Sequence, residues 1–169
     1  LCLAIAGQTD YEKGVLAGRV EVYQYIEDAV GGEWVQKGSS LLGEYRYDRY
    51  GYSVSISQDG SILAVGATGY DGAGGSSNAA SQGRTYVYKY DSDWILIKTI
   101  DGPTMGDYFG YDVATVKKTE SDDISLTVGI PYVDDEASNM GEVRAYLLSK
   151  SSANSQPLIT SSNSGGNNP

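Results

Sequence analysis

The fold is decided by the stretch YGYSVSISQDG (residues 50–60), SILAVGATGYD (61–71), a Gly/Ser/Asn-rich loop, and GRTYVYKY (83–90). Parts of this stretch recur in the same order on both sides of it. The matching segments are Leu3–Ala6, Leu63–Gly66 and Leu126–Gly129; Gly18–Tyr23, Gly83–Tyr88 and Gly141–Tyr146; Tyr50–Tyr52 and Phe109–Tyr111; and Glu33–Val35 and Asp93–Ile95. Matching positions lie 58 to 65 residues apart. Four markers that keep one period indicate a repeat array.

Each complete repeat is predicted to form four antiparallel strands. Apolar and polar residues alternate along the segments, as expected for strands with one buried face, and Asp59-Gly60 is typical of a tight hairpin turn. The expected strands are 1–7, 19–26 and the region of Trp34-Val35 in the first copy; 51–57, 62–67, 84–90 and 94–100 in the second; and 110–116, 124–130 and 143–148 in the third. We expect the fourth strand of the third copy to be missing, and we predict no helix.

This pattern predicts an all-β fold built of β-propeller blades, with about two and a half blades present as an open or partial propeller. Small residues at Ser53, Ser55, Asp112 and Ala114 suit the innermost strand of a blade. A parallel β-helix or solenoid is the alternative, but its coils are much shorter than this repeat. The predicted organisation is a propeller segment at residues 1–149 and a Ser/Asn/Gly-rich linker or tail at 150–169.

The net charge of the chain argues against some classes of binding partner. The sequence has 22 acidic and 12 basic side chains, no histidine, and a net charge of −10. Phosphate binding needs a clustered positive field, so we expect no nucleic-acid partner. The absence of histidine excludes imidazole chemistry, and no stretch reaches the roughly 20 apolar residues of a membrane span.

The repeat resembles the FG-GAP repeat, the blade of integrin-α-type propellers. The resemblance covers residues 1–150 and is carried by Phe109–Val113, Val128–Pro131 and Gly141–Tyr146, and again by Tyr50–Val54, Val65–Ala67 and Gly83–Tyr88. It implies a closed propeller, often of seven blades, that serves extracellular recognition and adhesion. The copies present here are fewer than a closed ring needs. We therefore expect a fragment of a longer polypeptide, or open edges that other chains cover.

The same resemblance raises calcium as a cofactor, because the family carries Asp and Asn ligands between its first and second strands. In the complete copy this segment is only Ser57–Gly60, too short to surround an ion that takes six to eight oxygens. The longer loop of the third copy offers Glu120, Asp122 and Asp123 as the calcium candidates. The alternative is a solvated polar turn, and no other cofactor is expected.

The loops between second and third strands, and those between blades, hold the candidate partner-binding residues. These are Asp10, Tyr45, Tyr47, Tyr70, Asp71, Tyr108, Tyr132, Asp134 and Asp135. Asp10, Asp71 and Asp134 follow Leu3, Leu63 and Leu126 by seven or eight residues, so they are either an acidic recognition face or caps of their turns. The tyrosines either bind a partner or pack between blades.

We therefore expect a non-enzymatic recognition or adhesion module, extracellular or at the cell surface, that binds a protein or glycan through its inter-strand loops. One alternative is a structural subunit of a filament, shell or larger complex, with its edges paired to other chains. Another is a propeller-type hydrolase that uses two carboxylates. The sequence contains neither a nucleophile-elbow motif nor a phosphate-binding loop.

Overall fold

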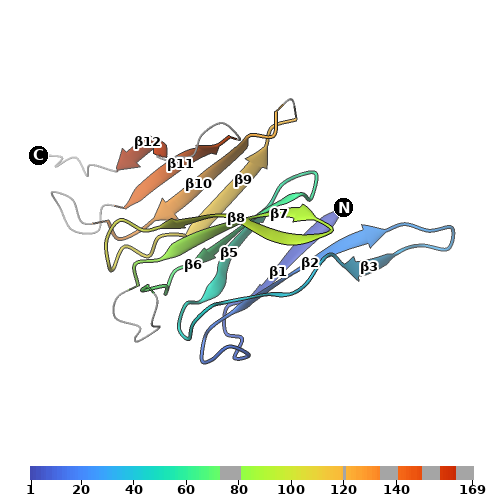
Figure 1. Cartoon of the computed structure of the whole chain (residues 1–169), viewed down its shortest axis with the longest axis horizontal. Coiled ribbons are helices and arrows are strands. Elements are labelled where there is room, and N and C mark those ends of the chain that lie inside the picture. Colours follow the sequence, from blue (N-terminus) through green and yellow to red (C-terminus); the bar gives the residue numbers. More distant parts are fainter. Residues whose placement is uncertain (73–80, 120, 134–140, 150–156, 163–169) are drawn as a thin grey trace, which may run out of the picture.

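The chain forms three four-stranded antiparallel sheets that follow one another along the sequence (Figure 1). The computed structural model describes residues 1–72, 81–119, 121–133 and 141–149, together with the backbone of the strand at 157–162. These residues are all-β and contain no helix, and therefore none that could cross a membrane. The prediction of an all-β fold is confirmed.

Each sheet is built in chain order from one end to the other. The first contains β1 (Cys2–Gly7), β2 (Arg19–Ile26) and β3 (Glu33–Gln36), with β4 (Leu41–Leu42) also paired to β2. The second contains β5 (Tyr50–Ile56), β6 (Ile62–Ala67), β7 (Arg84–Asp91) and β8 (Asp93–Asp101). The third contains β9 (Asp112–Lys117), β10 (Ile124–Ile130), β11 (Glu142–Leu148) and β12 (Pro157–Ser162). We call these sheets 1, 2 and 3.

The strands predicted from the sequence are present, but two were missed. The third repeat does have a fourth strand, because β12 pairs antiparallel with β11; the prediction that this strand is missing is wrong. The segment Pro157–Ser162 contains the two adjacent apolar residues Leu158 and Ile159. This short apolar pair inside the Ser/Asn/Gly tract was the sequence signal for the strand. The second missed strand is β4, which pairs with the start of β2 after a break at 37–40.

Contacts outside the strand ladders show that the repeat in the sequence corresponds to a repeat in the structure. Gly18 makes a parallel bridge to Tyr50, and Gly83 makes the same bridge to Phe109. The amide of Gly43 donates to the carbonyl of Gly18 at 2.9 Å, and the amide of Gly102 donates to that of Gly83 at the same distance. Equivalent residues of repeats one and two therefore make equivalent bonds.

The two hydrophobic cores lie between successive sheets. We call front face the side of each sheet that carries Leu3, Leu63 or Leu126, and back face the opposite side. In the first core, Val20 and Val22 of the back face of sheet 1 pack with Leu63 and Val65 of the front face of sheet 2. In the second core, Ala64 and Val87 of the back face of sheet 2 pack with Leu126 and Val128 of the front face of sheet 3. Each joint is thus back to front.

Strand β5 contacts both β1 of sheet 1 and β9 of sheet 3. Between β5 and β9, the Ser53 hydroxyl donates to the carbonyl of Gly110 at 2.7 Å, and the amide of Thr115 donates to the Ser55 hydroxyl at 3.0 Å. A Cβ at Gly66 would lie 2.1 Å from the Gly110 oxygen. Two of the small residues predicted for an innermost strand, Ser53 and Ser55, therefore bond directly to the neighbouring sheet or its entering connection.

Candidate functional site

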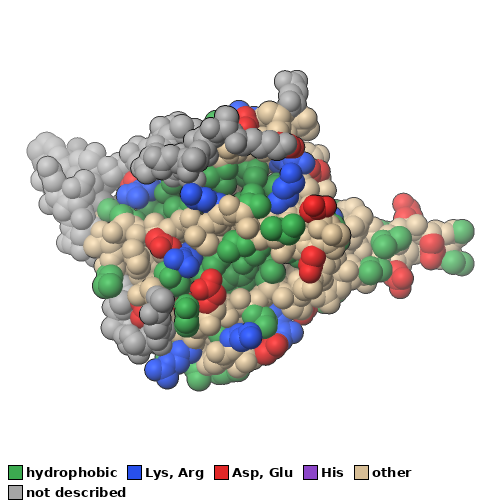
Figure 2. Space-filling view, in the orientation of Figure 1, with side chains coloured by type: hydrophobic (Ala, Val, Ile, Leu, Met, Phe, Trp, Pro, Cys, Tyr) green, Lys and Arg blue, Asp and Glu red, His purple; other side chains and the backbone are tan. Residues whose placement is uncertain are grey.

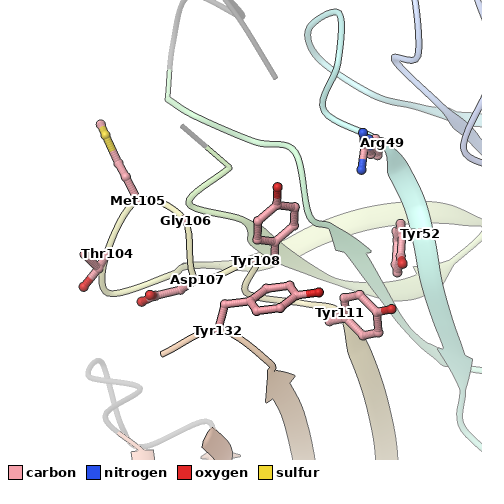
Figure 3. A pocket seen from close by; sticks show the side chains of 9 residues that line it. All are labelled: Arg49, Tyr52, Thr104, Met105, Gly106, Asp107, Tyr108, Tyr111 and Tyr132. Atoms are coloured by element: carbon pink, nitrogen blue, oxygen red, sulfur yellow. The ribbon is translucent and has the colours of Figure 1, made fainter. Parts of the chain in front are cut away.

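A hollow of about 500 Å³ opens where the first strands of sheets 2 and 3 begin (Figure 3). Its lining comprises Arg49, Tyr52, Thr104, Met105, Gly106, Asp107, Tyr108, Tyr111 and Tyr132. These residues come from the connections that enter β5 and β9, from the strand β5 itself, and from the end of β10. We call it the tyrosine hollow, because four of the nine side chains are tyrosines.

A repeated local structure places Tyr52 and Tyr111 at the hollow. Each follows a fully buried aromatic residue, Tyr50 or Phe109, and a glycine with positive φ. In the β5–β6 ladder, Tyr50 pairs with Ala67 and Ser53 with Gly66, so a bulge lies between Tyr50 and Ser53. A bulge re-aims a side chain. The sequence therefore anchors one ring in the core and turns the next one toward the hollow.

The tyrosines form two ring pairs that face each other across the hollow (Figure 3). Tyr52 and Tyr111 lie with ring centroids 4.9 Å apart and planes tilted by 48°. Tyr108 and Tyr132 meet edge to face, with centroids 5.3 Å apart. Tyr111 and Tyr132 remain 42% and 45% exposed, which leaves much of both rings accessible. A hydrogen bond with Tyr111 raises the pKa of the Tyr52 hydroxyl above its ordinary value, so the Tyr52 phenol is neutral at physiological pH.

The floor and rim of the hollow carry two charged side chains. Asp107 is 4% exposed and precedes Tyr108 in the connection to β9. Figure 3 shows Arg49 above the ring pairs. The amide of Arg49 donates to the Leu16 carbonyl at 3.0 Å, and the amide of Tyr108 makes the equivalent bond to Ser81 at 3.1 Å. The hollow is therefore set between residues that the repeat holds in defined positions.

Asp48 is the repeat equivalent of Asp107 and lies at the first joint. Its side chain is 1% exposed; one carboxylate oxygen accepts from the amide of Tyr45 at 2.9 Å, and the other has no hydrogen-bond partner in the structure. Burial raises the pKa of Asp48 to about 6. The hydrogen bond from the Tyr45 amide acts in the opposite direction and lowers this pKa, whereas the nearby charges of Glu44 and Asp71 raise it further. This carboxyl is therefore protonated in part near neutral pH.

Of the predicted partner-binding residues that the structure describes, Tyr108 and Tyr132 come together at the tyrosine hollow. Tyr45 and Tyr47 are half-buried, Tyr45 against the first core and Tyr47 with Arg46 at 5.8 Å from its ring centroid. Tyr70 is 5% exposed beneath the guanidinium of Arg84, at 3.8 Å from its ring centroid, which leaves little of the ring for a partner. Asp71 is half-buried beside this region, and Asp134 and Asp135 lie outside the described residues.

Asp10 is matched in the structure with Tyr70 rather than with Asp71. The amide of Asp10 donates to Gly7 and its carbonyl accepts from Gly18, while Tyr70 makes the same two bonds with Ala67 and Gly83. The Asp10 carboxylate accepts from the amide of Glu12 at 2.8 Å and lies 3.3 Å from Arg19. Asp10 thus caps its turn and holds the arginine that begins β2, as Tyr70 holds the arginine that begins β7.

The structure describes two of the three calcium candidates. Glu120 lies outside the described residues, whereas Asp122 and Asp123 are exposed or half-buried in the turn between β9 and β10. Within the described residues, no group of three or more His, Cys, Asp or Glu side chains is placed to hold a metal ion. Calcium therefore stays a prediction, without a ligand cluster to support it.

A second hollow, of about 560 Å³, lies at the opposite ends of β5 and β9. Asp59 and Lys117 line it and form an ion pair at 2.9 Å. Burial alone would raise the pKa of Asp59, but hydrogen bonds from Ser57, Lys117 and Ser61 outweigh it and hold the pKa well below its ordinary value. Because its carboxylate is engaged in this way, Asp59 in the turn between β5 and β6 links sheet 2 to Lys117 of sheet 3.

The sequence predictions missed Arg49, Tyr52 and Tyr111, which complete the tyrosine hollow. The signal was available, since a tyrosine follows the repeated glycine in both Tyr50–Tyr52 and Phe109–Tyr111. What sequence reasoning lacked for Tyr52 was the bulge between Tyr50 and Ser53, because without it Tyr52 belongs to a strand face instead of to the loop end.

Comparison with protein-family models gives no match, and comparison with curated proteins gives none either. The resemblance to FG-GAP repeats therefore rests on the motifs and their spacing, and membership of that family is a proposal.

Proposed function

We propose that the chain is a segment of an FG-GAP-like propeller that acts as a non-enzymatic recognition module at the cell surface or outside the cell. Support comes from three successive four-stranded sheets, the first two of which make the same loop contacts to the sheet that follows. The stacking of one sheet against the next, back to front, is the packing that successive blades require. Recognition then belongs to the loop end, where the tyrosine hollow lies.

The observation that carries this proposal is the convergence of four tyrosines from two successive repeats on one hollow. Tyrosine presents a large, rigid contact surface with a polar tip, at low cost in side-chain entropy, which is why it is enriched at binding sites. The exposed rings of Tyr111 and Tyr132 provide the stacking surface, and the hydroxyls and Arg49 provide polar contacts. This chemistry suits a loop of a protein or a sugar ring.

Binding is favoured over hydrolysis by the same lining. A hydrolase of the two-carboxylate kind needs a pair of acids across the scissile bond. Among the described side chains that line the hollow, Asp107 is the one that carries a carboxylate. At 4% exposure, its side chain suits support of the loop better than contact with a substrate.

The test is a binding screen of the purified chain on a glycan array and on an array of extracellular proteins. We expect at least one specific ligand, and we expect the double variant Tyr111→Ala/Tyr132→Ala to weaken its binding about tenfold or more, since buried aromatic anchors contribute on the order of 1 to 2 kcal/mol each. Tyr11→Ala is the matched control, because Tyr11 is 64% exposed and lies outside the hollow.

Binding that survives in the double variant and is lost with Tyr11→Ala would place the site elsewhere. Turnover of an arrayed glycan, with no retained ligand on either array, would overturn the proposal of a non-enzymatic module.

A further inference from the structure

The front face of sheet 1 is exposed at positions that are fully buried in the other two sheets. Leu3 is 45% exposed, whereas its equivalents Leu63 and Leu126 are 0% exposed. Ile5 is 51% exposed, whereas Val65 and Val128 are both 0% exposed. The side chains are equally apolar in all three copies, so the difference comes from what covers them and not from their chemistry.

The opposite situation occurs at the far end of the stack, on the back face of sheet 3. Val143 is 45% exposed, whereas its equivalents Val20 and Thr85 are 0% exposed. At the internal joints these positions contact the chain of the next repeat. A Cβ added at Gly51 would lie 2.9 Å from Cγ2 of Val20, and a Cβ added at Gly110 would lie 3.0 Å from the hydroxyl of Thr85. The described part of the molecule therefore ends in one free front face and one free back face.

The one acid among the central positions of the free front face is already neutralised within its own sheet. Glu21 is the register partner of Ile5. Its carboxylate accepts from the hydroxyls of Tyr23 at 2.9 Å and Ser40 at 2.8 Å and pairs with Arg19 at 3.3 Å. Covering a charge is costly unless it is paired and hydrogen-bonded. Glu21 meets that condition, so this face can be covered without leaving an unpaired charge.

We propose that the free front face of sheet 1 docks on the free back face of sheet 3 of a second copy of the chain. The joint would repeat, between molecules, the back-to-front contact that the chain makes twice within itself. Leu3, Ile5 and Tyr23 of one copy would cover Val143 and Ala145 of the next. Because the two faces differ, the contact is head to tail, and it generates a ring if the rotation closes or a filament if it does not. This gives the structural-subunit alternative a specific geometry.

The occupant follows from the internal joints. Both free faces belong to the same molecule, and each has its complement at the other end. Exposed apolar side chains lie on both faces, as Leu3 of β1 and Val143 of β11 illustrate. Strand β1 is the end strand of its sheet, while β6 and β10 are flanked by β5 and β9. The docking contact therefore falls on β1 and β2 of one copy and on β10 and β11 of the other.

Sedimentation equilibrium or light scattering over a wide concentration range tests the proposal directly. Wild-type chain is expected to reach at least twice the monomer mass of 18.0 kDa. Leu3→Glu, which damages one face, and Val143→Glu, which damages the other, are each expected to weaken association at least tenfold. Val30→Glu is the matched control, because Val30 is 97% exposed in the connection between β2 and β3, away from both faces.

A mixing experiment separates head-to-tail docking from symmetric association. Leu3→Glu retains an intact sheet 3, and Val143→Glu retains an intact sheet 1, so the equimolar mixture is expected to form a 1:1 pair and to stop there. Far-UV circular dichroism checks that both variants fold, and Ile5→Lys with Ala145→Lys provides a second pair. Wild type that stays monomeric, variants that do not pair on mixing, or association lost only with Leu3→Glu would each overturn the proposal.

Discussion

The two joints between sheets use the same repeat positions but different chemistry. At the first joint Tyr50 is buried, and its hydroxyl bonds to that of Tyr88 at 2.9 Å. At the second joint Phe109 takes the equivalent place, and its partner Tyr146 lies edge to face with centroids 6.4 Å apart. The aromatic pair of the first joint is therefore linked by a buried hydrogen bond, and the aromatic pair of the second joint by an edge-to-face ring contact. At this position the two repeats therefore share a buried aromatic ring, but they differ in whether the ring carries a hydroxyl group.

The largest effect is expected at the second joint, where the ring of Phe109 is fully buried. Phe109→Ala is predicted to lower the free energy of unfolding by about 3 to 5 kcal/mol, because it removes a fully buried ring and leaves a cavity. Urea denaturation measures this loss. Tyr111→Ala, two residues away and 42% exposed, serves as the control and is expected to cost far less. Equal losses in the two variants would contradict the assignment of Phe109 to the core.

The first joint is expected to respond to pH through Asp48. Because burial raises its folded pKa from 3.8 to about 6, the folded state binds a proton more tightly than the unfolded state. Its contribution to stability is fully present below pH 4 and is lost as the pH rises through about 6. The shift of about two pKa units corresponds to an upper limit of about 3 kcal/mol.

Asp48→Asn is predicted to flatten this dependence, since the amide oxygen can still accept from the amide of Tyr45 and carries no charge. Thermal unfolding of wild type and variant between pH 4 and 7.5 makes the comparison. Parallel curves for the two proteins would mean that Asp48 titrates alike in the folded and unfolded states.

The smallest effect is expected when the first joint is made to resemble the second. Tyr50→Phe removes one hydroxyl and leaves that of Tyr88 buried without its partner, which is predicted to cost about 1 to 2 kcal/mol. In the double variant Tyr50→Phe/Tyr88→Phe both partners are gone, and stability is expected to return close to that of the wild type. A double variant that is less stable than the sum of the single ones would show that these hydroxyls have further roles.

The sequence predicted most of the fold because the repeat supplied independent copies of each strand. Arg19–Ile26, for example, is a strand by alternation alone, and the structure gives the same bounds. The missed elements are the ones with little internal pattern. Strand β4 has two residues, and β12 lies in a tract of Ser and Asn whose pairing depends on β11. Both strands form because a neighbouring ladder offers hydrogen bonds, which is a tertiary effect.

The candidate site was predicted less well for a geometric reason. Tyr108 and Tyr132 were found because they lie in loops, whereas Tyr52 and Tyr111 have the spacing of strand residues. Only the bulge after Tyr50 directs Tyr52 away from the sheet. Asp10 and Asp71 were grouped by distance from a leucine, but a one-residue difference in the loops sets them at different positions. Spacing alone could not reveal either point.

The projecting connection between β2 and β3 shows the limit of the repeat. Figure 2 shows it extending from the body of the molecule, with hydrophobic and acidic side chains along it. Trp34 of the adjoining strand β3 is 45% exposed, whereas its equivalent Trp94 is 7% exposed and donates from its indole to the Lys37 carbonyl at 2.7 Å. A matching residue is thus buried only where a preceding sheet covers it, as for Leu3 and Leu63.

The central claim is that successive repeats set equivalent tyrosines side by side at the loop end. Nuclear Overhauser contacts between tyrosine ring protons measure this most directly in selectively labelled protein, with Tyr52→Phe and Tyr111→Phe to assign the signals. We predict a cross-peak between Tyr52 and Tyr111, whose ring centroids are 4.9 Å apart, and another between Tyr108 and Tyr132. A well-folded protein with no cross-peak between Tyr52 and Tyr111 would contradict the stacking of sheets 2 and 3 and the hollow that depends on it.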